Sequence, residues 1–135
     1  VRDAVGWQAA GSVAVAAILN PVLKNAFQVP RPEGEHLVKA SGWGFPSGHA
    51  MSAAAFFLVA AIGLMVVVKS RLARAAIAAG AAVCVILIGI SRIYLGVHSL
   101  VDVIAGWGAG LAVGFATIAA AQLLRSWALR QLKPH

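Results

Sequence analysis

The chain alternates long apolar runs with shorter polar ones, and four of the apolar runs approach the length needed to cross a membrane. About 20 predominantly apolar residues span the hydrocarbon core of a bilayer as a helix. The runs that we interpret as spans are Ala4 to Leu23, Met51 to Val68, Ala75 to Ile90 and Val103 to Leu124. The pattern predicts an all-α fold, a polytopic membrane bundle of about four transmembrane helices, with residues 1–135 forming a single membrane-embedded domain.

The first of these spans is less apolar than a lipid-facing helix would be. It contains Gln8, Ser12, Asn20 and Pro21. Polar side chains inside a membrane helix usually face protein or a water-filled cavity rather than lipid. We therefore expect this span either to pack as an amphipathic helix against protein or to line a polar cavity.

Composition supports the membrane interpretation and limits the partners. Hydrophobic residues make up 61% of the chain and charged residues 11%, whereas soluble domains are only about half apolar. A net charge of +7 could indicate nucleic-acid binding, but the basic residues lie at the ends of the apolar runs. We expect a lipid bilayer and no nucleic acid as the partner. The single cysteine, Cys84, has no disulfide partner in the chain and is interpreted as a small packed hydrophobe.

Basic residues are distributed unevenly between the two sets of predicted helix ends. One side carries Lys24, Arg31, Lys39 and Arg92. The other side carries Arg2, Lys69, Arg71, Arg74, Arg125, Arg130 and Lys133. Because cytoplasmic loops are enriched in Lys and Arg, the richer side is predicted to be cytoplasmic. The long connection from Asn25 to Pro46 and the stretch from Ser91 to Asp102 then share the outer face.

Glycines recur every fourth residue in the last span, at Gly106, Gly110 and Gly114. Small residues at this spacing allow the backbones of neighbouring membrane helices to approach closely. We interpret the stripe as packing inside one bundle. An oligomer contact through the same glycines is the alternative and is not predicted.

The stretch SRIYLGVHSLVD, from Ser91 to Asp102, places polar residues between two apolar spans. If a helix starts near His98, then His98 and Asp102 lie one turn apart on one face. The carboxylate can then accept a hydrogen bond from one imidazole nitrogen and leave the other nitrogen free, which is how a nucleophilic or general-base histidine is prepared. The alternative is a helix cap with an interfacial ion pair.

Two further segments bring charge and hydrogen-bond donors to the same face. Lys24 and Arg31 follow the first span, and either bind an anion or anchor the chain to phospholipid head groups. In the segment GWGFPSGHAMS, Ser47 can cap the second long helix, and the backbone N–H groups, unhindered at Gly48, can hold an anion. His49 lies in the first turn of that helix. A capped helix with an incidental histidine is the alternative.

Together the three segments indicate phosphoryl transfer rather than metal chemistry. Cations and a helix N-terminus can neutralise the oxygens of a five-coordinate phosphorus. One histidine attacks, the other protonates the leaving oxygen, and a carboxylate orients the attacker. The histidines show no close metal-ligand spacing. The only acids in the chain are Asp3, Glu33, Glu35 and Asp102.

These residues resemble the motifs of the type-two phosphatidic acid phosphatases, a superfamily that also includes glucose-6-phosphatase and the vanadium haloperoxidases. The family has a lysine separated by six residues from an Arg-Pro pair, a Pro-Ser-Gly-His tetrad, and Ser-Arg followed at fixed spacing by His and Asp. The corresponding residues here are Lys24, Arg31, Pro32, Pro46 to His49, Ser91, Arg92, His98 and Asp102.

The resemblance implies a role for each motif residue. His98 is expected to be the nucleophile that forms a phosphohistidine, Asp102 its orienting partner, and His49 the general acid for the leaving group. Family members need no metal, so neither a metal nor a cofactor is expected. The phosphate-binding residues that the resemblance implies are Lys24, Arg31, Ser47, Gly48 and Arg92.

The implied activity is hydrolysis of a lipid phosphomonoester or diphosphate by an integral membrane enzyme whose site faces the periplasmic or extracellular side of the plasma membrane. Family substrates include polyprenyl diphosphate, phosphatidic acid, phosphatidylglycerophosphate and polyprenyl-linked sugar phosphate, and the sequence does not choose among them. The alternatives are a haloperoxidase, a non-catalytic lipid-phosphate-binding subunit, and a phosphotransferase using the same site.

One feature departs from the family pattern. Membrane members commonly have six spans, with the lysine motif at the end of the third, whereas here Lys24 ends the first span. The four predicted helices are then either the core of a six-helix fold or a shortened family member.

Overall fold

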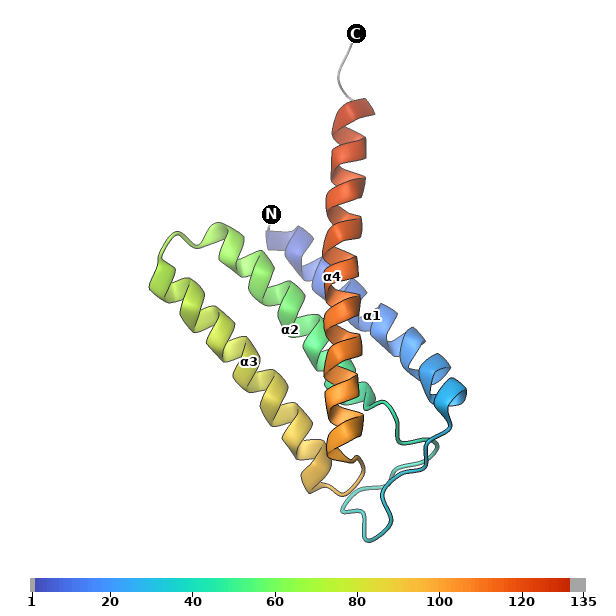
Figure 1. Ribbon diagram of the computed structural model, residues 1–135. Coiled ribbons are helices and arrows are strands. Elements are labelled where there is room, and N and C mark those ends of the chain that lie inside the picture. Colours follow the sequence, from blue (N-terminus) through green and yellow to red (C-terminus); the bar gives the residue numbers. More distant parts are fainter. Residues whose placement is uncertain (1, 132–135) are drawn as a thin grey trace.

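The computed structural model describes residues 2–131, and in this part of the chain the only regular secondary structure is α-helical. Each of the four helices is long and apolar enough to cross a membrane. The predicted all-α membrane bundle is therefore confirmed (Figure 1). The helices are α1 (Arg2–Phe27), α2 (Gly48–Val67), α3 (Arg71–Tyr94) and α4 (Leu100–Gln131).

Most helices extend further than the apolar runs predicted, because their polar ends continue the helical hydrogen bonding. Ser91 and Arg92 lie in the last turn of α3 rather than in a connection. Asp102 lies in the first turn of α4. The expected helix ends were wrong here because a long side chain such as Arg92 can reach the membrane surface from within a helix. The basic residue Lys133 lies outside the described residues.

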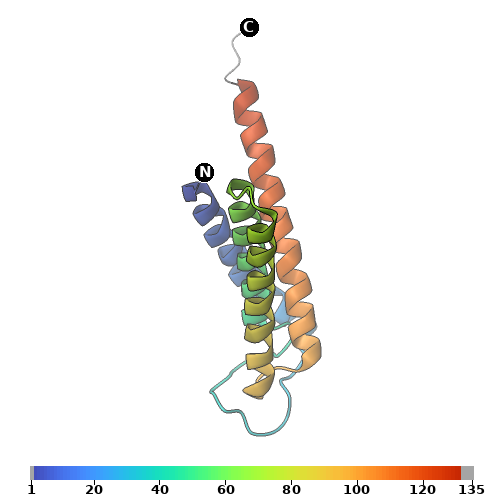
Figure 2. The ribbon, with the colours of Figure 1, turned by 90° about the vertical axis from the view of Figure 1, so that its left-hand side faces the viewer.

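Helix α2 occupies the middle of the bundle and contacts each of the other three helices (Figures 1 and 2). Its buried positions are mostly alanines, and the buried core joins Met51 and Ala55 of α2 to Ala16 of α1 and Val113 of α4. Small side chains allow membrane helices to pack closely. Helix α3 is the most peripheral of the four, since Gly89 is its only buried residue among those described.

The glycines of α4 lie against α2. A Cβ atom added at Gly106 would come within 2.6 Å of the Ser47 carbonyl oxygen, and one at Gly114 within 2.8 Å of a Leu58 methyl carbon. A Cβ at Gly110 would overlap the carbonyl oxygen of Met51. The stripe therefore packs inside one bundle, as expected, and holds the first turns of α2 close to α4.

The two polar connections meet at one end of the bundle. Residues 28–47 and 95–99 both lie at the lower end in Figure 1, with the N-terminal end of α1 and the C-terminal end of α4 towards the other end. The Leu37 N–H donates to Leu95 O over 3.1 Å and so joins the two connections, and the Ser47 N–H donates over 2.9 Å to Asp102 O in the first turn of α4. The segments predicted to share a face are thus brought together by direct bonds.

Candidate active site

A cavity of about 570 Å³ lies at this end of the bundle and contains many of the predicted site residues. Its wall is formed by α1, α2, α3 and the two connections. The lining residues are Ala17, Asn20, Lys24, Arg31, Gly48, His49, Ser52, Ala53, Phe56, Ile88 and His98. Lys24, Arg31, Gly48, His49 and His98, which are far apart in sequence, therefore share one cavity.

His98 and Asp102 form a buried pair beside the cavity. His98 is 5% exposed and Asp102 is 3% exposed, and His98 Nδ1 lies 3.6 Å from Asp102 Oδ2. This separation is slightly longer than a hydrogen bond. The other ring nitrogen, Nε2, lies 3.5 Å from Arg31 Nη1. Asp102 thus faces one nitrogen and leaves Nε2 on the side of the cations.

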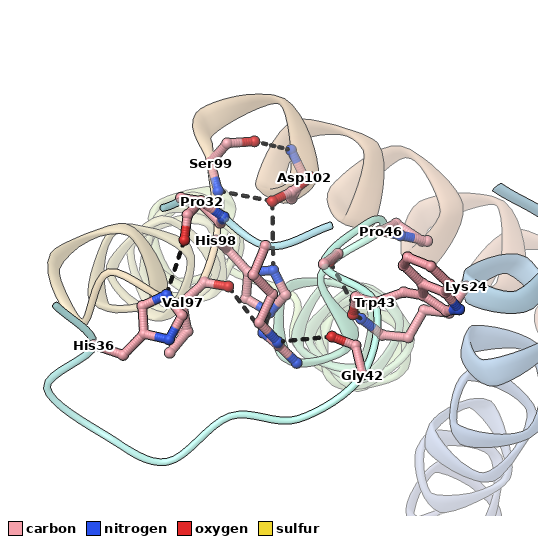
Figure 3. Close-up of polar contacts among 12 residues, drawn as sticks. Lys24, Pro32, His36, Gly42, Trp43, Pro46, Val97, His98, Ser99 and Asp102 are labelled. Carbon is pink, nitrogen blue, oxygen red and sulfur yellow. Dashed lines mark hydrogen bonds and ion pairs between the residues drawn. The ribbon is translucent and has the colours of Figure 1, made fainter. Parts of the chain in front are cut away.

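Asp102 is also a helix cap. Its Oδ2 accepts a hydrogen bond from the Ser99 N–H over 2.7 Å, and the Ser99 hydroxyl oxygen accepts one from the Asp102 N–H over 3.2 Å. Figure 3 shows Asp102 facing both Ser99 and His98. The helix begins at Leu100, so His98 precedes it rather than starting it. The capping interpretation of this stretch is therefore confirmed, and the cap holds Asp102 where it faces the imidazole. The catalytic interpretation of the same pair stays a prediction.

The surroundings of His98 favour its neutral form. Burial lowers the pKa of His98 from its usual 6.5 to about 4, and the positive charges of Arg31 and Lys24 add to this effect, while the Asp102 carboxylate opposes it. Burial disfavours a charged imidazole because it removes water from the ring. A neutral imidazole has an unprotonated ring nitrogen at pH 7, as a nucleophile requires.

Arg31 and Lys24 are bonded to backbone carbonyls of the long connection. Arg31 donates from Nε to Gly42 O over 3.2 Å and from Nη2 to Ser41 O over 3.0 Å. It also donates from Nη1 to Val97 O over 2.8 Å, which links the two connections. Lys24 donates from Nζ to Trp43 O and to Gly44 O. Both cations therefore line the cavity and also hold the long connection, part of which forms the cavity wall.

Arg92 is held differently. Its Nε donates to the Ser91 hydroxyl oxygen over 3.1 Å, and that hydroxyl donates in turn to Ile88 O over 2.7 Å. Among the described residues no acceptor binds the terminal nitrogens of Arg92, and Arg92 is not part of the cavity wall. Ser91 is a motif residue to which no individual role was assigned, and the structure shows it as the hydrogen-bond acceptor for Arg92.

The first turn of α2 lacks the side-chain cap that was expected from Ser47. Ser47 occupies the position before the helix, but its side chain makes no capping hydrogen bond, so that prediction was wrong. The side chain is fully buried where α2 meets α4, and its hydroxyl has no partner among the described residues. The first N–H groups of α2 are consequently left without a side-chain cap. An uncapped helix N-terminus facing a cavity favours an anion.

His49 lies in the first turn of α2 and lines the cavity together with Ser52, one helical turn further along. His49 is exposed, in contrast to the buried His98. Asn20 lines the cavity, as one of the two expectations for the polar residues of the first span predicted, whereas Ser52 is a lining residue for which no role was predicted. Among the described residues, no three His, Cys, Asp or Glu side chains cluster as a metal site would require. The arrangement combines one buried imidazole, one exposed imidazole, two cations and a helix N-terminus around a cavity.

The comparisons with known proteins agree with this arrangement. The sequence profile of the PAP2 superfamily matches residues 5–126. The chain is 41% identical over 104 residues to phosphatidylglycerophosphatase B of Bacillus subtilis (strain 168), a match that covers 73% of this chain and 49% of that protein.

The fold is also that of a solved membrane enzyme. The crystal structure of a transmembrane PAP2-type phosphatidylglycerolphosphate phosphatase from Bacillus subtilis superposes with a TM-score of 0.79 at 34% identity, over 87% of this chain and 59% of that one. The chain thus spans about half to three fifths of the length of these relatives. Since the family profile covers nearly the whole sequence, this membrane protein belongs to the PAP2 superfamily.

Proposed function

We propose that residues 1–135 form a membrane-embedded domain that hydrolyses a lipid phosphomonoester or diphosphate through a phosphohistidine intermediate. The observation that carries the proposal is the buried His98, with Asp102 on its Nδ1 side, in one cavity with His49, Lys24 and Arg31. These residues place a neutral nucleophile, a second imidazole and positive charge around one cavity. The names of the relatives support the same class of reaction.

In the first step His98 Nε2 attacks phosphorus, a P–N bond forms, and the P–O bond to the leaving group breaks. His49, in its protonated form, gives its proton to the leaving oxygen. Asp102 stabilises the imidazole as it becomes positively charged. In the second step neutral His49 takes a proton from water, whose oxygen attacks phosphorus as the P–N bond breaks. Inorganic phosphate leaves, and both histidines return to their starting states.

The phosphate is bound at the polar end of the cavity. The cations Lys24 and Arg31 and the uncapped N–H groups at Gly48 face the oxygens that gain charge in the transition state. We assign phosphate contacts to Ser47 and Arg92 as well. Among residues 2–131 the Ser47 hydroxyl has no hydrogen-bond partner and the terminal nitrogens of Arg92 have no acceptor. Each would therefore gain a hydrogen bond from a phosphate bound within its reach.

The apolar part of the same wall suits a lipid. Ala17, Ala53, Phe56 and Ile88 lie on α1, α2 and α3, within the membrane-spanning segments. A lipid could keep its chains against these residues while its head group reaches the polar end. Phosphatidylglycerophosphate is the substrate favoured by the named relatives. Phosphatidic acid, polyprenyl diphosphate and polyprenyl-linked sugar phosphate carry the same reacting group and belong in the same test.

The test is phosphate release by the purified protein in detergent from a panel of these lipids, with and without EDTA. We expect hydrolysis of at least one lipid phosphate, unchanged by EDTA and abolished by His98→Ala. Trapping with radiolabelled phosphate should give an acid-labile, base-stable label on wild type and none on His98→Ala. EDTA-sensitive turnover, or full activity of His98→Ala, would contradict the proposal.

A further inference from the structure

Asn20 is a buried polar residue of α1 whose side chain reaches the loop that opens α2. It is 9% exposed and lies within a membrane-spanning segment. Its Nδ2 donates to Pro46 O over 3.2 Å and lies 3.8 Å from the sulfur of Met51. A polar group at this depth is costly unless it is bonded or used. The bond joins α1 to the first residue of the Pro-Ser-Gly-His segment.

The other end of the Asn20 amide fits closely against Gly48. A Cβ atom added at Gly48 would lie 2.8 Å from Asn20 Oδ1 and 3.2 Å from its carbonyl carbon. Only glycine leaves room for the amide at this contact. Asn20 therefore touches this segment at two points, a hydrogen bond at Pro46 and a steric contact at Gly48.

Asn20 also lies one helical turn before Lys24, and both residues line the cavity together with Gly48 and His49. Residues four apart lie on the same face of a helix. The Asn20 amide thus lies between α1, which carries Lys24, and the N-terminal end of α2, which offers free N–H groups. Its contacts determine how far apart these two phosphate-binding elements lie.

We propose that Asn20 is a positioning residue that sets the first turn of α2 against Lys24, and so fixes the width of the phosphate-binding end of the cavity. This rests on the proposed function of the site. Asn20 acts through the backbone at Pro46 and Gly48 rather than on the reacting atoms. The consequence is that Asn20 and Gly48 form a matched pair, in which the fit of one depends on the other.

The matched pair can be tested by a double-mutant cycle. Gly48→Ala places a methyl group against the amide, so we expect a lower Tm and a loss of kcat/KM of about 100-fold. Asn20→Ala removes one buried hydrogen bond, so we expect a loss of about tenfold in kcat/KM. Asn20→Ala combined with Gly48→Ala should be more active and more stable than Gly48→Ala alone, because the clash is gone. Multiplicative losses in activity and additive losses in Tm would overturn the proposal.

Ser12→Ala is the matched control for a merely structural role. Ser12 is a fully buried polar residue of the same helix whose hydroxyl donates to Ala9 O within α1, away from the cavity. We expect Ser12→Ala to keep kcat/KM and the inhibition constant for inorganic vanadate, and Asn20→Ala to raise that constant about tenfold. Equal effects of the two substitutions on vanadate inhibition would contradict positioning by Asn20.

The outcomes for Asn20 and for the proposed function are separable. Full activity of Asn20→Ala beside an inactive His98→Ala would contradict only the role of Asn20. Absence of phosphate release by wild type from every lipid tested would contradict the proposed function. In that case the Tm values of the double-mutant cycle still report whether Asn20 and Gly48 are coupled.

Discussion

At the scale of single residues, one oxygen of Asp102 makes two contacts. Its Oδ2 accepts the Ser99 N–H at 2.7 Å and lies 3.6 Å from His98 Nδ1. The capping bond fixes the carboxylate beside the imidazole. We predict that its negative charge stabilises His98 when the imidazole becomes positively charged. Removing the negative charge should therefore affect the chemistry more than the shape of the site.

Asp102→Asn tests this division of labour. The amide oxygen can still accept the Ser99 N–H, so α4 should start at the same place. The charge that stabilises a positive His98 is lost, so we expect kcat to fall by at least about 100-fold. The inhibition constant for vanadate should change by less than about threefold, because the phosphate-binding groups are untouched. An equal loss in rate and in vanadate affinity would show that Asp102 acts on the phosphate itself.

The lowered pKa of His98 predicts a specific titration. Its ring should stay neutral from pH 7 down to about pH 4 in the folded protein, whereas an unfolded chain takes up this proton near pH 6.5. Because the unfolded state binds the proton first, His98 lowers the stability of the fold as the pH falls from 6.5 towards 4. The imidazole nitrogens of ¹⁵N-histidine-labelled protein report the midpoint, with His98→Gln providing the assignment. A midpoint near 6.5 for His98 would contradict the effect of burial and of the neighbouring cations.

At the scale of elements, the seam between α2 and α4 positions the site. The glycines of α4 admit the backbone of α2, and the backbone bond from Ser47 to Asp102 O ties the two candidate catalytic segments together. Asn20 does the same between α1 and α2. The central helix α2 is thus held on both sides near its N-terminal end, where His49 lies.

Gly110 and Gly108 allow a controlled test of the packing between α2 and α4. A Cβ at Gly110 would overlap Met51 O, whereas a Cβ at Gly108 would meet nothing within 4 Å. Gly110→Ala should destabilise the bundle by about 1–3 kcal/mol through overpacking. Gly108→Ala should leave stability unchanged or raise it slightly, because alanine is the better helix former. Thermal unfolding in detergent measures both. Similar Tm values for the two variants would show that α2 and α4 can move apart without loss of stability.

At the scale of the whole molecule, the position of the site across the membrane follows from charge. The connection between α2 and α3 lies at the end of the bundle opposite the cavity. It carries Lys69 and leads into α3, whose first residue is Arg71. The positive-inside rule then predicts that the cavity lies at the outer leaflet. On this prediction a substrate would reach the site from the periplasmic or extracellular half of the plasma membrane.

Labelling of single cysteines tests this orientation in a Cys84→Ala background. Glu33 is exposed in the long connection, and Lys69 is exposed between α2 and α3. The neighbouring Gly34 is unsuitable for a cysteine, because its φ of +122° is one that other residues rarely adopt. In intact cells or spheroplasts a membrane-impermeant maleimide should label Glu33→Cys, and should label Lys69→Cys only after permeabilisation. The reverse pattern would invert the topology.

The sequence alone determined the features that depend on local properties. The existence of each span follows from the length of its apolar run, and the motif residues follow from their identity and spacing. The orientation that the count of basic residues indicates stays a prediction. Even the segments sharing one face could be deduced, because each span reverses the direction of the chain. The helix ends were less predictable, since Ser91 and Asp102 are compatible with both helix and connection.

The tertiary structure decided which partner each polar group binds. Arg31 donates to Val97 O, 66 residues away, and Asn20 donates to Pro46 O, 26 residues away. No local pattern specifies such bonds, because a cation or an amide can bind any acceptor that packing brings near it. Ser47 was likewise expected to cap α2, but its fully buried side chain makes no capping hydrogen bond. Sequence could name the candidate chemical groups, whereas the packing of distant segments selected their contacts.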